Sequence, residues 1–161
     1  MSSFVSDFTL RAATPEDASL ILEMLRELAI YERVPENAFS LTQDKVLRDM
    51  LGAACQCDLA FSGRKPAGIV TWFWTYKSFR GQRGLYVEDL YVKPEFRGRG
   101  LGRHFLVELA GRARAVGGHM EWQVLDWNAQ AIAFYESLGA RLVPQWVNCR
   151  LEGEALEALA S

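Results

Sequence analysis

The sequence predicts an α/β protein with a mixed sheet covered by helices, because strand-like and helix-like segments alternate along its 161 residues. Hydrophobic residues make up 50% of the chain and charged residues 24%, an ordinary globular balance. No linker, internal repeat or low-complexity block interrupts the chain. We therefore expect a single domain over residues 1–161, with its core at about residues 8–152.

The amino-terminal half predicts a strand, two helices and two further strands. Thr14 and Pro15 suit a helix start, and apolar side chains then recur at helical spacing until Pro35 ends the run near residue 34. Aromatic and β-branched residues around a Gly-Arg-Lys-Pro turn favour two paired strands. The expected strands here are 8–11, 59–62 and 67–76, and the expected second helix is 42–51.

The carboxy-terminal half predicts further strands and helices in alternation. Pro94 closes a strand over 85–92, and the Gly117-Gly118 pair ends a helix over 101–116. Asn128 suits the N-cap of a later helix, and Gly139 suits its end. The other expected elements are a loop at 77–84, strands at 120–125, 141–143 and 146–151, a helix at 129–138 and a short acidic tail from 154.

The most informative motif is the run Arg97-Gly98-Arg99-Gly100-Leu101-Gly102, between an expected strand and an expected helix. The first-turn amides of a helix and its dipole attract anions, and glycines let a pyrophosphate approach the backbone. The run therefore predicts a phosphorylated cofactor. A Walker loop needs Gly-Lys followed by Ser or Thr, whereas Arg103 and His104 follow Gly102. This departure excludes ATP and GTP, and the glycine spacing disfavours NAD.

Charge and composition narrow the partners further. A formal net charge of −2 gives no broad basic field, so we expect no nucleic-acid partner. Residues 1–7 do not resemble a signal peptide and no run is long enough to span a bilayer, which predicts a cytoplasmic protein without a membrane partner. The three cysteines form no C-x-x-C pair and the two histidines lie far apart, so we expect no metal.

Taken as Arg97-x-x-Gly100-x-Gly102, the loop resembles the coenzyme A pyrophosphate motif of the GCN5-related N-acetyltransferase (GNAT) superfamily. Five further segments resemble its diamine (spermidine/spermine) and thialysine acetyltransferase branch, so the resemblance covers nearly the whole chain. They are 27–32, 72–76, 86–92, 124–128 and 133–140. The resemblance implies acetyl-CoA as cosubstrate, a homodimer, and the GNAT fold, with a mixed, mostly antiparallel sheet of about six to seven strands flanked by helices.

Acetyl transfer to an amine requires a base, because an alkyl ammonium with a pKa near 10 is almost wholly protonated at pH 7. Glu88 is the candidate base, and strand alternation predicts that Asp89 faces the opposite side of the sheet. The resemblance implies that Tyr135 protonates the departing thiolate. A solvated acidic pair and a tyrosine of the core are the structural alternatives for these residues.

The resemblance also implies which residues contact the two substrates. Backbone groups on a splayed strand would meet the thioester, and the glycine run would hold the pyrophosphate. The implied cofactor set is Leu90, Tyr91, Val92, Arg97, Gly98, Arg99, Gly100, Leu101, Gly102, Arg103 and Asn128, and the implied amine set is Tyr31, Glu32 and Glu88. The structural alternatives are that Asn128 only caps its helix and that each arginine is only a solvated surface residue.

The identity of the amine stays open. Lys77, Arg80 and Arg83 precede the Glu88 strand and would repel a second ammonium, which suits an amine that also carries a carboxylate. We predict acetylation of a primary amine of a small molecule, namely a lysine-like amino acid, diamine or polyamine, by direct attack in a ternary complex. Acetylation of a protein amino terminus or lysine and a non-catalytic acyl-CoA-binding module are the alternatives.

Overall fold

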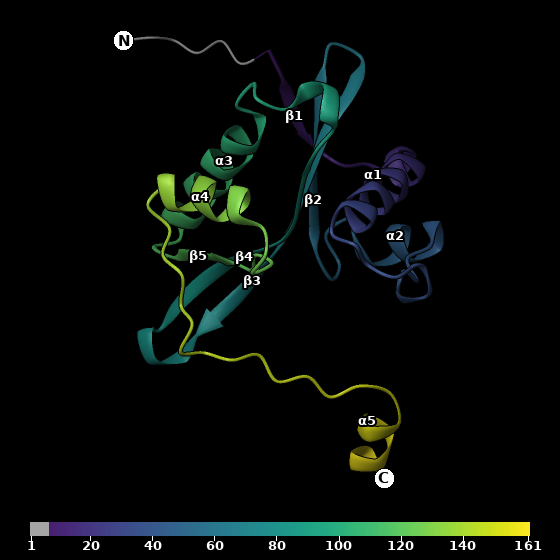
Figure 1. Cartoon of the computed structure of the whole chain (residues 1–161), viewed down its shortest axis with the longest axis vertical. Coiled ribbons are helices and arrows are strands. Elements are labelled where there is room, and N and C mark those ends of the chain that lie inside the picture. The colour runs from purple at the N-terminus through teal and green to yellow at the C-terminus, as the bar shows by residue number, and fades with distance from the viewer. Residues whose placement is uncertain (1–6) are drawn as a thin grey trace. The chain divides into compact units, whose positions relative to one another are not determined.

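A computed structural model describes residues 7–161, which fall into two compact units (Figure 1). The first unit ends at Gln123 and carries the sheet, and the second comprises Val124–Ser161. Residues 1–6, which belong to the segment expected to lack a signal peptide, lie outside the described part of the chain. The expectation of a single domain stays a prediction. No helix within residues 7–161 is both long and apolar enough to traverse a bilayer.

The first unit is built on a five-stranded sheet whose spatial order follows the chain. Neighbouring strands are antiparallel except for the last pair, β4 and β5, which is parallel. The strands are β1 (Thr9–Ala12), β2 (Gln56–Ser62), β3 (Lys65–Lys77), β4 (Gln82–Val92) and β5 (His119–Trp122). The predicted mixed, mostly antiparallel sheet is confirmed, and five strands in the described residues replace the expected six to seven.

Helices cover both faces of this sheet (Figure 1). α1 (Ala18–Tyr31) and α2 (Gln43–Asp49) lie on one face, and α3 (Leu101–Ala115) lies on the other. The apolar stripe of α1 packs against α2 and alternate residues of the central strands, because successive strand side chains point to opposite faces. The buried residues of this cluster are Ala18, Ile21, Met24, Leu25, Leu28, Val46, Met50, Cys57, Leu59, Ile69 and Tyr91.

A buried carboxylate ties the other face of the sheet to α3. Asp58 on β2 accepts hydrogen bonds from Trp72 Nε1 at 2.8 Å and from Arg112 Nη1 on α3 at 2.6 Å. Trp72 therefore points toward α3, and the preceding residue, Thr71, points toward α1. A residue of β4 that pairs with a β3 residue points to the same face of the sheet as that β3 residue, so the alternation along β3 also gives the faces of the paired β4 residues.

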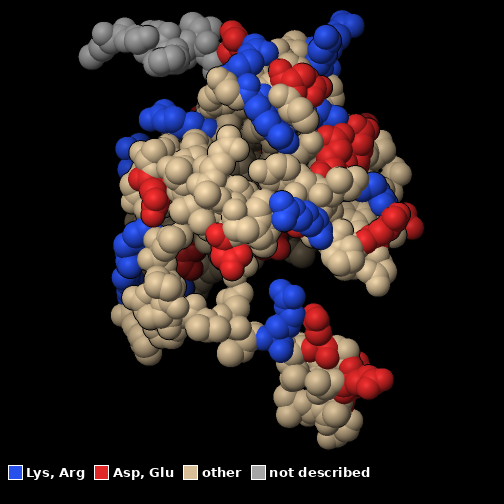
Figure 2. Space-filling model, in the orientation of Figure 1, with Lys and Arg blue, Asp and Glu red and all other residues tan. Residues whose placement is uncertain are grey.

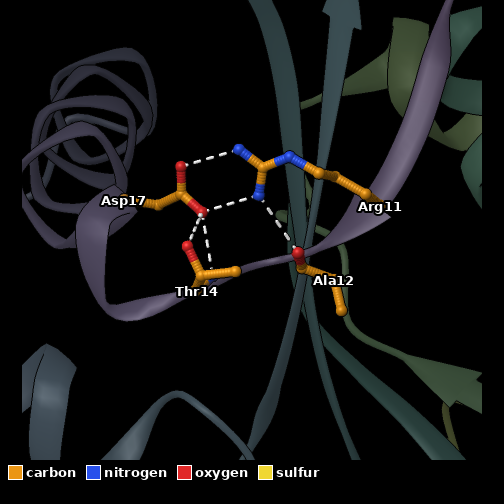
Figure 3. Close-up of polar contacts among 4 residues, drawn as sticks. All are labelled: Arg11, Ala12, Thr14 and Asp17. Atoms are coloured by element: carbon orange, nitrogen blue, oxygen red, sulfur yellow. Dashed lines mark hydrogen bonds and ion pairs between the residues drawn. The ribbon is translucent and has the colours of Figure 1, made fainter.

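The start of α1 is fixed to β1 by an ion pair (Figure 3). Arg11 Nη1 and Nη2 donate to the Asp17 carboxylate at 2.7 and 2.8 Å, and Thr14 N donates to it at 2.8 Å. The hydrogen bond from Arg11 is the main reason that the pKa of Asp17 is lowered to about 2. The helix start predicted at Thr14 is thus a short 3-10 turn, Pro15–Asp17, that leads into α1.

Three local predictions require correction. Residues 141–152 contain no strand, their side chains are exposed, and they pair with no described strand. β propensity alone does not form a strand without hydrogen bonds to a neighbouring strand. The expected acidic tail is instead a helix, α5 (Gly153–Ala160), because Glu, Ala and Leu are strong helix formers. The expected loop at 77–84 is shorter, because β3 and β4 extend to either side of the turn Ser78–Arg80.

The surface carries both signs of charge. Figure 2 shows Lys and Arg side chains and Asp and Glu side chains recurring over the visible face of the first unit. Such a mixed surface agrees with the formal net charge of −2. The expected homodimer, the cytoplasmic location and the lack of nucleic-acid, membrane and metal partners stay predictions.

Candidate functional site

The glycine run forms the entrance to α3. Gly98 and Gly100 have φ angles of 73° and 79°, and a Cβ at either position would meet nothing within 4 Å. Gly100 is the N-cap of α3, and its carbonyl accepts a 3.0 Å hydrogen bond from His104 N. The amides of the first helical turn, 101–103, therefore have no intrahelical acceptor. Left-handed backbone, open space and unused amides suit the predicted anion site.

The start of α3 lies close to the sheet because Gly68 has no side chain. A Cβ at this position would lie 2.7 Å from Tyr91 O and 3.2 Å from Leu101 Cδ2 and Phe105 Cε2. Gly68 pairs with Val92 at the carboxyl end of β4. A glycine on β3 thus lets the glycine run rest beside the end of β4.

The three arginines of this region have different surroundings. Arg97 Nε donates to Val92 O at 2.9 Å, so its side chain turns back toward β4. Arg99 forms an ion pair with Asp7 at 3.0 Å. Arg103 is exposed on the first turn of α3, and within residues 7–161 no side chain ion-pairs with it. Arg103 is therefore the arginine most available to a phosphate in this conformation.

β4 carries a bulge at Glu88. Thr71 pairs with Asp89 across the β3–β4 ladder, whereas the next residue on β3, Trp72, pairs with Val87. Glu88 is thus the extra residue of β4. A bulge interrupts the ladder locally and re-aims side chains, and such features are frequent beside active sites.

The bulge bears on the predicted opposite orientation of Glu88 and Asp89. Asp89 lies on the α1 face with its partner Thr71, whose hydroxyl donates to Asp89 Oδ2 at 2.5 Å. Both carboxylates also act on Glu32 at the end of α1, because each raises the pKa of that side chain after the larger effect of burial. The extra residue of the bulge removes the regular alternation between 87 and 89, so alternation no longer supports opposite faces for the pair, and that orientation stays a prediction.

Glu32, Glu88 and Asp89 form what we call the acidic cluster. Burial is the main cause that raises the pKa of all three, and Asp89 adds to the rise for Glu88. The hydrogen bond from Thr71 opposes the effect of burial on the pKa of Asp89. Burial, followed by the charges of Asp89 and Glu88, raises the pKa of the nearby Cys55 thiol to about 11. The cluster therefore favours a cation, and Cys55 is a thiol rather than a nucleophilic thiolate.

A capping motif holds Glu32 at the end of α1. Arg33 N donates to Ile30 O at 3.1 Å and Val34 N donates to Ala29 O at 2.9 Å, which is the Schellman arrangement. Arg33 has a φ of 61°, the left-handed conformation that glycine usually occupies. The chain therefore turns sharply immediately after Glu32.

β4 separates from β5 beside the acidic cluster. Within residues 7–161 these strands pair only between Gly84–Val87 and His119–Trp122. β4 continues to Val92 against β3 alone, so one backbone edge of 88–92 has no strand partner in the described part of the chain. This geometry suits the expected splayed strand, whose amides at Leu90, Tyr91 and Val92 would meet a thioester.

Two of the three basic residues that precede the Glu88 strand, Lys77 and Arg83, have contacts of their own. Lys77 forms an ion pair with Glu121 at 3.1 Å. The Arg83 guanidinium lies 5.1 Å from the centre of the Trp74 ring, and Trp74 shares the α3 face with Trp72. Arg83 therefore lies on the sheet face opposite Asp89.

Two predicted site residues lie in the second unit, on or before α4 (Ala129–Ser137). Asn128 Oδ1 accepts a hydrogen bond from Ala131 N at 3.2 Å, so the predicted capping role is confirmed. Tyr135 is half-buried, and its ring centre lies 5.4 Å from that of Phe134. The roles of both residues toward the cofactor and the leaving thiolate stay predictions.

Comparison with known families decides the identity of the fold and site. Residues 21–140 match the model of the acetyltransferase (GNAT) family. The chain belongs to this family. The prediction of a GNAT N-acetyltransferase is confirmed, and membership implies acetyl-CoA as the cosubstrate.

Named relatives of this acetyltransferase cover nearly all of it. The chain is 34% identical over 160 residues to thialysine N-epsilon-acetyltransferase of Caenorhabditis elegans, across 97% of this chain and 99% of that protein. It is 33% identical over 165 residues to the Sus scrofa enzyme of the same name, across 94% and 96%. Over 94 residues it is 43% identical to L-ornithine N5-acetyltransferase NATA1 of Arabidopsis thaliana, across 58% of this chain and 41% of that protein.

Solved structures show the same fold. An integron cassette protein of Vibrio cholerae superposes with a TM-score of 0.79 at 21% identity, across 96% of this chain and 98% of that one. An aminoglycoside acetyltransferase from an uncultured soil sample, solved with trehalose, superposes with a TM-score of 0.75 at 16% identity, across 94% and 100%. At these identities the likeness establishes the architecture of the acetyltransferase alone.

The sequence did not predict two residues that build the acidic cluster. Asp89 belongs to it because of the bulge, and Thr71 because it pairs with Asp89 across β3 and β4. The adjacent acids at 88 and 89 were a visible signal. The bulge was not, because a one-residue irregularity leaves no mark in a hydrophobic pattern.

Proposed function

We propose that this acetyltransferase moves the acetyl group of acetyl-CoA onto a primary amine of a small molecule, in particular the side-chain amine of an amino acid. The acidic cluster is the observation that carries the proposal, because three neighbouring carboxylates, of which Asp89 is partly buried and Glu32 and Glu88 are exposed, attract an alkylammonium ion. Two of the three lie on β4, the strand that leads into the glycine run. The cluster thus supports an amine site close to where the thioester would lie.

In the proposed reaction the amine attacks the carbonyl carbon of acetyl-CoA directly. A carbon–nitrogen bond forms and the carbon–sulfur bond breaks, so the sulfur leaves with the electron pair as the coenzyme A thiolate. The ammonium loses two protons in becoming an amide. One of them, or its equivalent, goes to the thiolate and the other goes to solvent. No covalent intermediate with the protein is needed.

Glu88 is the proposed base. Burial, and then the charge of Asp89, raises the pKa of Glu88, which makes its carboxylate a better proton acceptor than a solvated one. Asp89 and Glu32 would hold the ammonium while Glu88 takes its proton directly or through one water. Tyr31, the last residue of α1, would contact the carbon chain of the amine.

The cosubstrate would be held by backbone. Amides of the glycine run, Arg97 to Gly102, would bind the pyrophosphate, with Arg103 as a side-chain contact to phosphate. Amides of Leu90 to Val92 would stabilise the oxyanion that develops on the thioester carbonyl. Asn128 would contact the cofactor, and Tyr135 would protonate the thiolate.

An amino acid is favoured over a polyamine by the extent of the similarity. The thialysine acetyltransferases match 94–97% of this chain, whereas the spermidine/spermine N(1)-acetyltransferase-like protein 1 of Homo sapiens is 33% identical across 83% of this chain and 20% of its own length. The ornithine acetyltransferase of Arabidopsis thaliana supports the same class of substrate. Lysine analogues and ornithine are therefore the first amines to test.

The test is a panel of amines assayed with acetyl-CoA. Release of free thiol would be followed for thialysine, ornithine, lysine, putrescine and spermidine, and each product would be identified by mass spectrometry. We expect the highest kcat/KM with an amino acid that carries a second amine. Acetylation confined to added proteins would favour a protein acetyltransferase, and tight binding of acetyl-CoA without turnover would favour a non-catalytic binding module.

A further inference from the structure

Three residues on one face of α1 contact the segment that follows β4. Glu23, Glu27 and Tyr31 are spaced four residues apart, so their side chains lie one above another along the helix. Lys93 Nζ donates to Glu23 Oε1 and to Glu27 Oε1, both at 3.0 Å. Tyr91 Oη donates to Glu27 Oε2 at 2.6 Å. α1 is therefore bound to β4 by a row of polar contacts.

The last contact in this row comes from the glycine run. The Arg97 guanidinium carbon lies 5.3 Å from the centre of the Tyr31 ring and 5.7 Å from that of the Tyr91 ring. Arg97 Nε also donates to Val92 O at 2.9 Å, which fixes the plane of the guanidinium at the end of β4. A guanidinium near an aromatic ring is attracted to its face. Arg97 thus joins the glycine run to the last residue of α1.

This arrangement gives Arg97 contacts that phosphate binding does not explain. Its Nε donates to a carbonyl and its guanidinium lies near two rings, whereas Arg103 lies on the first turn of α3 without an ion-pair partner in the described residues. The residue that Arg97 contacts, Tyr31, immediately precedes Glu32 of the acidic cluster. A shift of the glycine-run backbone would therefore move the Arg97 side chain, and through its contact with Tyr31 would change the position of Glu32.

We infer that Arg97 is a positioning residue that couples the cosubstrate loop to the amine-binding end of α1. The inference rests on the proposed function, because it concerns the same amine site. When a pyrophosphate orders the loop, Arg97 would hold Tyr31 and Glu32 in place, so that cosubstrate binding tightens amine binding. By linkage, the amine would tighten cosubstrate binding by the same factor.

Titration calorimetry with two probes tests the inference. Ornithine is titrated into protein alone and into protein saturated with desulfo-CoA, and desulfo-CoA is titrated into protein alone, so that the ratio of the two ornithine affinities gives the coupling. We expect Arg97→Gln to weaken ornithine by about three- to tenfold, as expected for loss of a guanidinium–ring contact and a charged hydrogen bond, and to change desulfo-CoA binding to the protein alone by less than about twofold.

Two matched variants separate the possible causes. Arg103→Gln should show the opposite pattern, with weaker desulfo-CoA and nearly unchanged ornithine binding. Lys93→Gln removes the contacts to Glu27 and Glu23, which lie one and two turns before Tyr31, respectively. It should lower the free energy of unfolding and leave ornithine binding unchanged. Equal weakening by Lys93→Gln and Arg97→Gln would mean that Arg97 acts through stability alone, which would overturn the inference.

The contact itself is tested by changing Tyr31. Tyr31→Phe keeps the ring, so the effect of Arg97→Gln on ornithine binding should persist in that background. Tyr31→Leu removes the ring, so Arg97→Gln should then have almost no further effect. Tyr31 is 44% exposed, so Tyr31→Phe and Tyr31→Leu are expected to fold, and circular dichroism checks each double variant before titration.

The outcomes distinguish the inference from the proposed function. If Arg97→Gln weakens desulfo-CoA and spares ornithine, Arg97 is a phosphate ligand and the coupling role is wrong. If wild-type protein binds ornithine but releases no thiol from acetyl-CoA, the proposed reaction is wrong and the binding titrations still decide the coupling. If wild-type protein binds neither ornithine nor thialysine, both the coupling role of Arg97 and the proposed function are wrong.

Discussion

Thr71 donates a 2.5 Å hydrogen bond to Asp89 across the β3–β4 pair, immediately beside the bulge at Glu88. Thr71 is fully buried. Burial raises the pKa of Asp89 above the value of 3.8 that an unfolded chain would give it, and the hydrogen bond offsets only part of the rise. The folded protein therefore binds a proton at Asp89 more tightly than the unfolded protein does.

Asp89→Asn is expected to stabilise the fold in a pH-dependent way. Because the pKa of Asp89 is raised in the folded state, the ionised carboxylate destabilises the fold above that pKa, and this cost disappears as pH falls below the unfolded value. The variant, which keeps an acceptor for Thr71, should gain most over wild type near pH 8 and nothing near pH 3. Urea unfolding across this range measures the difference, with the exposed Asp44→Asn as control. A gain that grows as pH falls would contradict the burial of a charged Asp89.

The same substitution should move the acidic limb of the pH–rate profile. The charge of Asp89 raises the pKa of Glu88, after the larger effect of burial. If Glu88 is the base, its protonation lowers kcat at acidic pH, and Asp89→Asn should shift this limb to lower pH. Measurement of kcat from pH 5 to 9 with a saturating amine decides the point. An unmoved limb, or one that moves upward, would remove Glu88 as the titrating base.

Gly100→Ala should weaken binding of the cosubstrate, whereas Gly111→Ala, in the middle of α3, should not. Gly100 has a φ of 79°, and a Cβ there would project into the open space proposed for the pyrophosphate. The backbone strain of about 1–2 kcal/mol is present with and without ligand and lowers stability instead. We expect the steric conflict to lower desulfo-CoA affinity about tenfold or more, a loss of about 1.4 kcal/mol of binding free energy.

Gly111→Ala is the matched control for that variant. Gly111 lies in the middle of α3, and a Cβ there would meet nothing within 4 Å. Its replacement should keep desulfo-CoA affinity and stabilise the helix by up to about 1 kcal/mol. Equal loss of affinity in both variants would contradict a specific anion site at the glycine run.

Tyr135→Phe should lower kcat by about 10²-fold or more, because the phenol is the proposed proton donor to the thiolate. The KM values should change little, since the ring remains. Tyr76→Phe is the control, because Tyr76 is 68% exposed near the end of β3 and has no proposed role. An unchanged kcat in Tyr135→Phe would leave Tyr135 as a packing residue of α4.

Sequence patterns were sufficient for the elements whose signal is local. The helix α3 begins at Leu101, as the glycine run indicated, and Asn128 caps α4 as its side chain predicted. The spacing of apolar residues likewise placed α1 with an error of a few residues at its start. Caps and helical periodicity depend on neighbours within one turn, so the sequence alone reveals them.

Features that depend on distant partners were not predictable. The bulge at Glu88 arises from the register between β3 and β4, so alternation alone does not give the relative faces of Glu88 and Asp89. The contacts of Arg97 with Tyr31 and Val92 join residues from different elements, so its motif did not indicate them, and its assignment to a phosphate stays a prediction. Residues 141–152 have the composition of strands but lack a described partner strand, so they form none.

The rate of thiol release from acetyl-CoA with a saturating amino acid diamine, compared between wild type and Glu88→Gln, tests the central claim most directly. Wild type should turn over, and Glu88→Gln should be slower by about 10²-fold or more with desulfo-CoA affinity retained, because it keeps the shape of the side chain and removes the base. Equal rates in the two proteins, or no thiol release by wild type with any amine of the panel, would contradict the claim that the acidic cluster activates an amine for acetyl transfer.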